Sequence, residues 1–183
     1  MEFVKSFKQT KLIKYLFIAL LGSILLAISS KIKIPFYPVP MTMQTFVVLC
    51  IGVAFGWKLG LATISLYLFE GILGLPVFSG TPEKGIGIVY FIGPTMGYLV
   101  GFIIAVYFAG RFNYDDSLFK TFFKLTFATS FIYLFGMLWL GNLIGWDKPI
   151  FKLGAQPFLL AELFKILIAT LAIKQIKKLR KIV

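Results

Sequence analysis

One apolar stretch, Pro157-Phe-Leu-Leu-Ala-Glu162-Leu-Phe-Lys165-Ile-Leu-Ile-Ala-Thr-Leu-Ala172, contains two charged residues. On a helix, the i, i+3 spacing places Glu162 and Lys165 on one face. Each charge costs at least ~2.5 kcal/mol at bilayer depth, so such residues persist when they turn inward, pair, or serve a polar ligand. The segment indicates either a structural ion pair that fixes helix rotation or, as we favour, a polar substrate site inside a helical bundle.

The composition is that of an integral membrane protein. Hydrophobic residues make up 59% of the 183 residues, charged residues make up 14%, and the mean hydropathy is +0.91. A soluble domain of this length cannot bury so much apolar surface, so we expect one transmembrane domain over residues 1–183. The net charge of +12 does not indicate nucleic acid, because the basic residues flank apolar segments and suit lipid headgroups.

The sequence argues against an enzyme. It has no histidine, which removes the usual proton shuttle, the commonest metal ligand and the Ser-His or Cys-His nucleophiles. The single cysteine, Cys50, cannot form an internal disulfide or a cysteine zinc site. The phosphate-binding pattern G-x-x-x-x-G-K-[ST] is absent, so any energy from ATP must come through a partner. We therefore expect no cofactor in this chain.

Long uncharged stretches predict six transmembrane helices, because about 20 apolar residues cross a bilayer as a helix. The stretches are 15–30, 34–57, 59–82 with Glu70 inside it, 85–110, 125–146, and 157–173, which is broken only by Glu162 and Lys165. A cleaved signal peptide is the alternative for the first stretch, but its apolar run is longer than that of a signal peptide.

Positive charge predicts the orientation. Thirteen basic residues lie on the side of the termini and five on the other, which places both termini in the cytoplasm of a prokaryotic cell. The thirteen are Lys5, Lys8, Lys11, Lys14, Lys58, Arg111, Lys120, Lys124, Lys174, Lys177, Lys178, Arg180 and Lys181, and the five are Lys31, Lys33, Lys84, Lys148 and Lys152.

Two irregular connections are expected on the side opposite the termini. Residues 34–40 contain three prolines, which exclude a regular helix. Residues 74–85 form a second loop that is first apolar and then polar. Irregular backbone near lipid is tolerated where protein buries it or where it lines a cavity. We therefore expect a lid over an outward-facing pocket, with short re-entrant caps as the alternative.

Polar and aromatic residues near this outer end are candidate ligand contacts. The Gln44 amide offers one acceptor and two donors, which suit a neutral hydrogen-bonding ligand. Glu70 is similar, although it can also snorkel to the interface. Aromatic residues gather here either as ligand walls or as an interfacial belt. They are Phe36, Tyr37, Phe78, Tyr90, Phe91 and Tyr98.

Small residues form a stripe on the first helix. Ala19, Ser23 and Ala27 recur every four residues, which lets a second helix approach closely in lipid. The stripe predicts either packing inside this chain or a docking surface for another membrane subunit.

Four motifs in this order closely resemble the BioY family. They are Pro38-Val-Pro-Met-Thr-Met-Gln44-Thr, Gly74-Leu-Pro-Val-Phe-Ser-Gly80, Gly93-Pro-Thr-Met-Gly-Tyr98 and the segment with Glu162 and Lys165. That family comprises the biotin-binding S components of energy-coupling factor (ECF) transporters. The resemblance implies a bundle of six membrane helices with an outer pocket. It also implies a transmembrane coupling subunit and two ATPase subunits as partners, which alone would use ATP for biotin uptake.

The resemblance also implies residue roles. Gln44 matches a ligand-binding glutamine, and Glu162 and Lys165 match an acidic-x-x-lysine pair that lines the pocket. The stripe of Ala19, Ser23 and Ala27 matches the surface that packs against the coupling subunit. Two departures are visible. Glu162 stands where the family usually has aspartate, and the loop after Gly80 differs from many members, which leaves the partner of the ligand carboxylate open.

Biotin suits the predicted pocket. Glu162 and Gln44 would meet its ureido group. Apolar walls would come from Val39, Met41, Phe78 and Tyr90, and the carboxylate would meet Lys165 or Lys84. The alternatives are a carrier of another vitamin on the same fold, a stand-alone secondary permease, and a purely structural membrane subunit.

Overall fold

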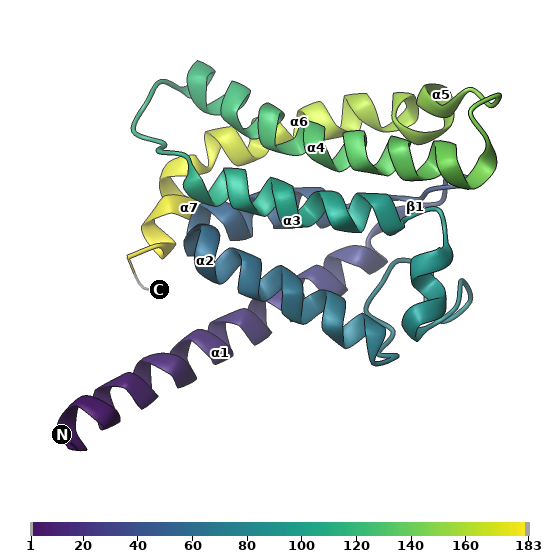
Figure 1. Ribbon diagram of the computed structural model, residues 1–183. Helices are drawn as coiled ribbons and strands as arrows, with labels where there is room; N and C mark the ends of the chain where they lie inside the picture. Colours follow the sequence, from purple (N-terminus) through teal and green to yellow (C-terminus); the bar gives the residue numbers. More distant parts are fainter. Residues whose placement is uncertain (1, 182–183) are drawn as a thin grey trace.

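The computed structural model describes residues 2–181, with side chains from residue 11 onward (Figure 1). Its helices are α1 (Glu2–Lys31), α2 (Gln44–Ile72), α3 (Met96–Arg111), α4 (Leu118–Ile144), α5 (Ile150–Gly154), α6 (Leu159–Leu171) and α7 (Ile173–Leu179). Two 3₁₀ turns, η1 (Gly87–Ile92) and η2 (Gln156–Phe158), and two short antiparallel strands, β1 (Lys33–Ile34) and β2 (Met41–Thr42), complete it. The all-α class is confirmed. The chain ends and the side chains of Lys5 and Lys8, used above for the orientation, lie outside the described residues.

Helix α2 doubles back on itself at Gly56. The backbone there leaves the helical region, with φ at 73° and ψ at 171°, a conformation that glycine adopts without steric cost. A Cβ atom on Gly60 would lie only 3.7 Å from the Cα atom of Gly52, whereas residues eight apart in a straight helix are about 12 Å apart. The two halves, 44–55 and 57–72, therefore run antiparallel (Figure 1). This turn is the predicted break between the second and third apolar stretches.

Four helical stretches within the described residues are long and apolar enough to cross a membrane. They are Lys11–Lys31, Gln44–Ile72, Leu118–Ile144 and Ile150–Leu171, and α3 is apolar but shorter. The predicted boundaries are wrong around prolines and glycines. Residues 34–43 are not helical, α2 ends at Ile72 instead of reaching 82, and α3 begins at Met96 instead of 85. Proline lacks the backbone donor that a helix interior needs.

Helices α3 and α4 approach each other closely through two glycines. A Cβ atom on Gly97 would lie 2.3 Å from the carbonyl oxygen of Phe135, and one on Gly101 would lie 2.5 Å from the Cα atom of Ile132. Small residues at such contacts let backbones pack tightly in lipid. This contact brings Phe102 and Ile132 together in the buried core.

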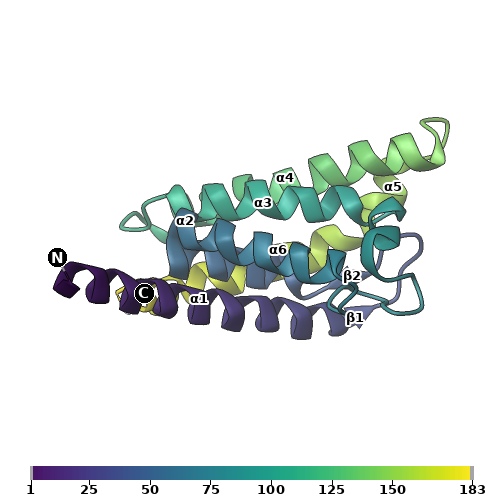
Figure 2. The ribbon, with the colours of Figure 1, turned by 60° about the horizontal axis from the view of Figure 1, so that its bottom comes forward.

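The two ends of the bundle differ in character. Toward one end lie the Gly56 turn, α7 and the loop before α4, joined by polar contacts (Figures 1 and 2). There Arg180 donates to the carbonyl of Gly110, and Lys177 forms an ion pair with Asp115. Toward the other end lie β1, β2, η1 and the loop of residues 74–85, which we call the lid loop. This second end holds the functional site.

Candidate functional site

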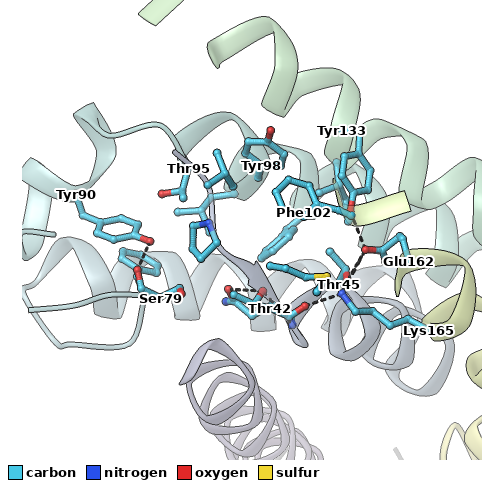
Figure 3. A pocket seen from close by; sticks show the side chains of 18 residues that line it. Thr42, Thr45, Ser79, Tyr90, Thr95, Tyr98, Phe102, Tyr133, Glu162 and Lys165 are labelled. Atoms are coloured by element: carbon cyan, nitrogen blue, oxygen red, sulfur yellow. Dashed lines mark hydrogen bonds and ion pairs between the residues drawn. The ribbon is translucent and has the colours of Figure 1, made fainter. Parts of the chain in front are cut away.

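A central cavity of about 50 Å³ lies beneath the outer loops (Figure 3). Residues from α2, α3, α4 and α6 line it, together with residues from the loops around β2, the lid loop and η1. The lining residues are Val39, Pro40, Met41, Thr42, Gln44, Thr45, Phe78, Ser79, Tyr90, Thr95, Tyr98, Leu99, Phe102, Ile132, Tyr133, Phe158, Glu162 and Lys165. Six of the seven predicted ligand contacts therefore line this one cavity. Val39, which was predicted as an apolar wall, lines it as well.

Lys165 and Glu162 form the charged end of the cavity. Their side chains lie on one face of α6, with 3.4 Å between Lys165 Nζ and Glu162 Oε2. Both residues are buried, at 7% and 4% exposure. Lys165 Nζ also donates to the carbonyl of Thr42 at 2.6 Å and to Thr45 Oγ1 at 3.1 Å. The ammonium group is thus held as much by β2 and the start of α2 as by its ion-pair partner.

The two carboxylate oxygens of Glu162 are in different environments. Oε2 accepts hydrogen bonds from Thr45 Oγ1 at 3.0 Å and from the hydroxyl of Tyr133 at 2.8 Å. Oε1 is buried and has no hydrogen-bond partner among the described residues. A buried acceptor left without a donor costs about 1–3 kcal/mol. Glu162 therefore offers one free acceptor to a ligand that brings an N–H or O–H donor.

Gln44 links the cavity to the lid loop. Its Nε2 donates to the hydroxyl of Tyr67 at 2.7 Å, and that hydroxyl donates to the carbonyl of Val77 at 3.1 Å. Thr42 Oγ1 donates to Gln44 Oε1 at 3.3 Å. The amide therefore lies at the cavity and at the same time fixes a loop that closes it.

Aromatic rings and a serine form the opposite end of the cavity. The rings of Phe78 and Tyr90 stack with centroids 4.7 Å apart, and the Tyr90 hydroxyl donates to the carbonyl of Ser79 at 2.8 Å. Ser79 Oγ is buried without a hydrogen-bond partner in the described part of the chain. Figure 3 shows Ser79 and Tyr90 at one end and Glu162 and Lys165 at the other, with Phe102 between them. The cavity thus has polar groups at both ends, and both the Phe102 ring and the polar Thr42 lie between them.

Lys84, the seventh predicted contact, does not line the cavity. Its side chain is exposed and crosses over Gly80. A Cβ atom on Gly80 would lie only 2.8 Å from Lys84 Cδ. Gly80 has a φ of 82°, so the lid loop turns sharply there and directs Lys84 over its own backbone. Partial desolvation and, second, the charge of Lys33 lower the pKa of Lys84.

The predicted stripe on α1 is mostly covered by this chain itself. Ser23 is fully buried, and its hydroxyl donates to Glu70 Oε1 at 2.8 Å. This contact gives Glu70 a role in packing α1 against α2, and Glu70 does not line the cavity. Ala27 packs at the edge of the core. Ala19 is 5% exposed and lines a separate groove between α1 and α2.

Several site residues were missed from the sequence. Thr45, Tyr133 and Ser79 supply hydrogen bonds or free polar atoms at the cavity, and Tyr67 holds the Gln44 amide from behind it. Thr45 and Ser79 stand inside the quoted motifs, which was a usable signal. Tyr133 had only the weak signal of a hydroxyl within an apolar stretch.

The fold and the cavity define a multi-pass membrane protein with buried polar groups in a central cavity, built on the S-component fold. The structure aligns with a crystal structure described as the S-component for biotin from an ECF-type ABC transporter, with a TM-score of 0.76 over 92% of this chain and 93% of that chain, at 21% identity. The chain belongs to the BioY family, whose profile matches residues 4–182. The resemblance read from the motifs is confirmed.

Curated relatives agree with the family assignment. A probable biotin transporter BioY of Pyrococcus horikoshii is 36% identical over 145 residues, which cover 77% of this chain and 82% of the relative. The biotin transporter BioY of Thermotoga maritima is 32% identical over 156 residues, covering 85% and 90%. The family is one of membrane transporters, not of enzymes.

Proposed function

We propose that this chain is the biotin-binding S component of an ECF-type transporter and serves biotin uptake. Its family membership and the names of its relatives support this function. The observation that carries it is the unpaired, buried Oε1 of Glu162 at one end of a cavity whose other end offers the unpaired hydroxyl of Ser79. A ligand that fits needs N–H donors at one end and an anionic or acceptor group at the other.

Biotin meets both requirements in one orientation. Its ureido N–H groups would donate to Glu162 Oε1. Its apolar ring and chain would lie against Met41 and Phe102, which line the cavity. The carboxylate would lie toward Ser79, because the Lys165 ammonium at the other end is already engaged by Glu162, Thr45 and the carbonyl of Thr42. Lys165 then serves to orient Glu162 through the contact between their side chains.

Binding requires the walls to move. Pockets for drug-sized ligands enclose roughly 300–1,000 Å³, whereas this cavity has about 50 Å³. The α3–α4 contact is fixed by the backbone approach at Gly101, so the loops over the cavity are the elements that can yield. We infer that the lid loop opens to admit the ligand.

We further propose six membrane crossings by α1, the two halves of α2, α3, α4 and α6, within one domain. Both termini would be cytoplasmic in a prokaryotic cell membrane. The gathering of Lys177, Arg180 and Lys124 at the end of the bundle that holds the Gly56 turn supports this orientation, because basic loops stay on the cytoplasmic side.

Assembly with a coupling subunit would use a groove at this same end. The α1–α2 groove encloses about 630 Å³. Leu12, Tyr15, Leu16, Ala19, Phe55, Gly56, Trp57, Lys58, Leu59, Ala62 and Arg180 line it. Its mostly apolar walls suit a helix of another membrane subunit. ATP hydrolysis would take place in the two ATPase subunits of the complex.

Equilibrium binding to the purified chain tests the proposal. We expect saturable binding of labelled biotin with a Kd below about 1 μM, which corresponds to about −8 kcal/mol, without ATP or partner subunits. Thiamine and riboflavin should not compete. Absence of saturable binding, or equal preference for another vitamin, would exclude the assignment.

A further inference from the structure

The outer end of α1 holds the lid loop by a set of hydrogen bonds. Ser30 Oγ donates to the carbonyl of Val77 at 2.8 Å. Lys31 Nζ donates to the carbonyl of Phe78 at 2.9 Å, to Thr81 Oγ1 at 3.0 Å and to the carbonyl of Thr81 at 3.4 Å. The last two residues of α1 therefore bind the lid loop on both sides of Ser79.

These contacts fall where the lid loop meets the cavity. Phe78 and Ser79 both line it, and the Phe78 side chain is 1% exposed. The carbonyl that Lys31 binds belongs to Phe78 itself. Displacement of the ammonium group would therefore free the backbone at the point where the loop closes over the ligand.

The direction of Lys31 is unusual for a lysine at the end of an apolar helix. Such a lysine ordinarily extends to the headgroups and water. The ammonium of Lys31 instead turns onto loop oxygens, and hydrogen bonds from an ionised donor are roughly twice as strong as those between neutral groups. Lys31 and Lys33, two residues further on in β1, are both exposed, but Lys33 has no side-chain hydrogen bond among residues 11–181.

We propose that Lys31 is a positioning residue for the ligand, which holds the lid loop closed over the cavity and so sets how long biotin stays bound. The inference rests on the proposed function. Lys31 does not line the cavity and acts through the backbone at Phe78 and Thr81. Ser30 supports the same closure at Val77.

Two measurements on the Lys31→Met variant test this role. Biotin should dissociate about tenfold faster, with a smaller change in the association rate, because the closed loop blocks exit. A spin label on Glu83→Cys, in a Cys50→Ala background, should become more mobile even without biotin. Lys31→Arg should restore most of the slow dissociation, since it keeps a charged donor. Lys33→Met is the matched control and should behave as the parent protein.

The two measurements separate the inference from the proposed function. If the parent protein binds no biotin, the proposed function fails, and the spin label still decides whether Lys31 holds the loop. If Lys31→Met does not fold, Ser30→Ala provides the test and should loosen the label and speed dissociation in the same direction. Unchanged label mobility, or dissociation equal to that of Lys33→Met, overturns the inference.

Discussion

Glu162 and Lys165 form a buried ion pair that, under the proposed function, also serves as the ligand site. The 3.4 Å separation between Lys165 Nζ and Glu162 Oε2 is longer than the 2.6 Å contact of the same ammonium with the carbonyl of Thr42. The carboxylate is in turn held by Thr45 and Tyr133. Neither charge thus depends on the other alone, and the pair can position the free oxygen of Glu162 for a ligand.

Substitution of the pair tests its role at the level of single residues. Glu162→Gln should weaken biotin binding roughly ten- to a hundredfold, because a charge-assisted hydrogen bond of about 1.5–3 kcal/mol is lost. Lys165→Met should also weaken binding, since it removes the donor that orients the carboxylate. Detergent melting and biotin titration would be measured on each, with the exposed Ser130→Ala as control.

The Glu162→Gln/Lys165→Met double variant separates the two hypotheses about the pair. If the pair were only structural, each single change would strand a buried charge, and the double variant would recover both stability and affinity. We expect its affinity to stay low. Wild-type affinity in the double variant would remove the pair from the ligand site.

The sequence located most of this site but could not assemble it. Burial of charge in an apolar stretch identified Glu162 and Lys165 directly. Thr45, in contrast, meets Lys165 across 120 positions of the chain, and no local pattern encodes such a contact. Lys84 was predicted as a contact from its charge, which is visible in the sequence, whereas the turn at Gly80 that directs it over the loop backbone and away from the cavity lining is a backbone property.

At the scale of elements, the length of the apolar stretches and the turn residues predicted which segments are helical. They predicted the residues at which the helices begin and end less well. The turn at Gly56 falls at the predicted break between the stretches 34–57 and 59–82. Hydropathy placed residues 34–43 and the lid loop partly inside spans, because these segments are as apolar as the helices. The proline-rich composition of 34–40 correctly indicated irregular backbone there. The helices end at these segments because proline cannot donate the backbone hydrogen bond of a helix interior, not because the segments are polar.

Gly71 positions the lid loop relative to α2. A Cβ atom there would lie 2.0 Å from Phe78 Cζ, so Gly71→Ala must displace the ring that stacks on Tyr90. Overpacking costs about 1–3 kcal/mol, and we expect roughly tenfold weaker biotin binding, measured by titration. Ser65→Ala, at an exposed position of the same helix, should leave affinity unchanged. Equal affinities of the two variants would show that Phe78 does not close the site.

At the scale of the whole molecule, α1 joins the two ends. Its outer end holds the lid loop through Ser30 and Lys31, and its other end lines the α1–α2 groove with Leu16 and Ala19. The contact of Ser23 with Glu70 at 2.8 Å fixes α1 to α2 between them. A partner that binds in the groove and moves α1 would therefore act on a helix that also holds the lid loop.

Filling the α1–α2 groove should separate ligand binding from transport. Ala62 is exposed and lines the groove, so Ala62→Trp adds bulk there without entering the core. Because the groove and the cavity share no lining residue, the purified variant should bind biotin as the parent does. Co-purification with a coupling subunit and biotin uptake by cells should both fall at least about tenfold. Ser65→Trp, on the same helix outside the groove, is the control for bulk alone. Normal assembly of Ala62→Trp would place the coupling subunit on another face of the bundle.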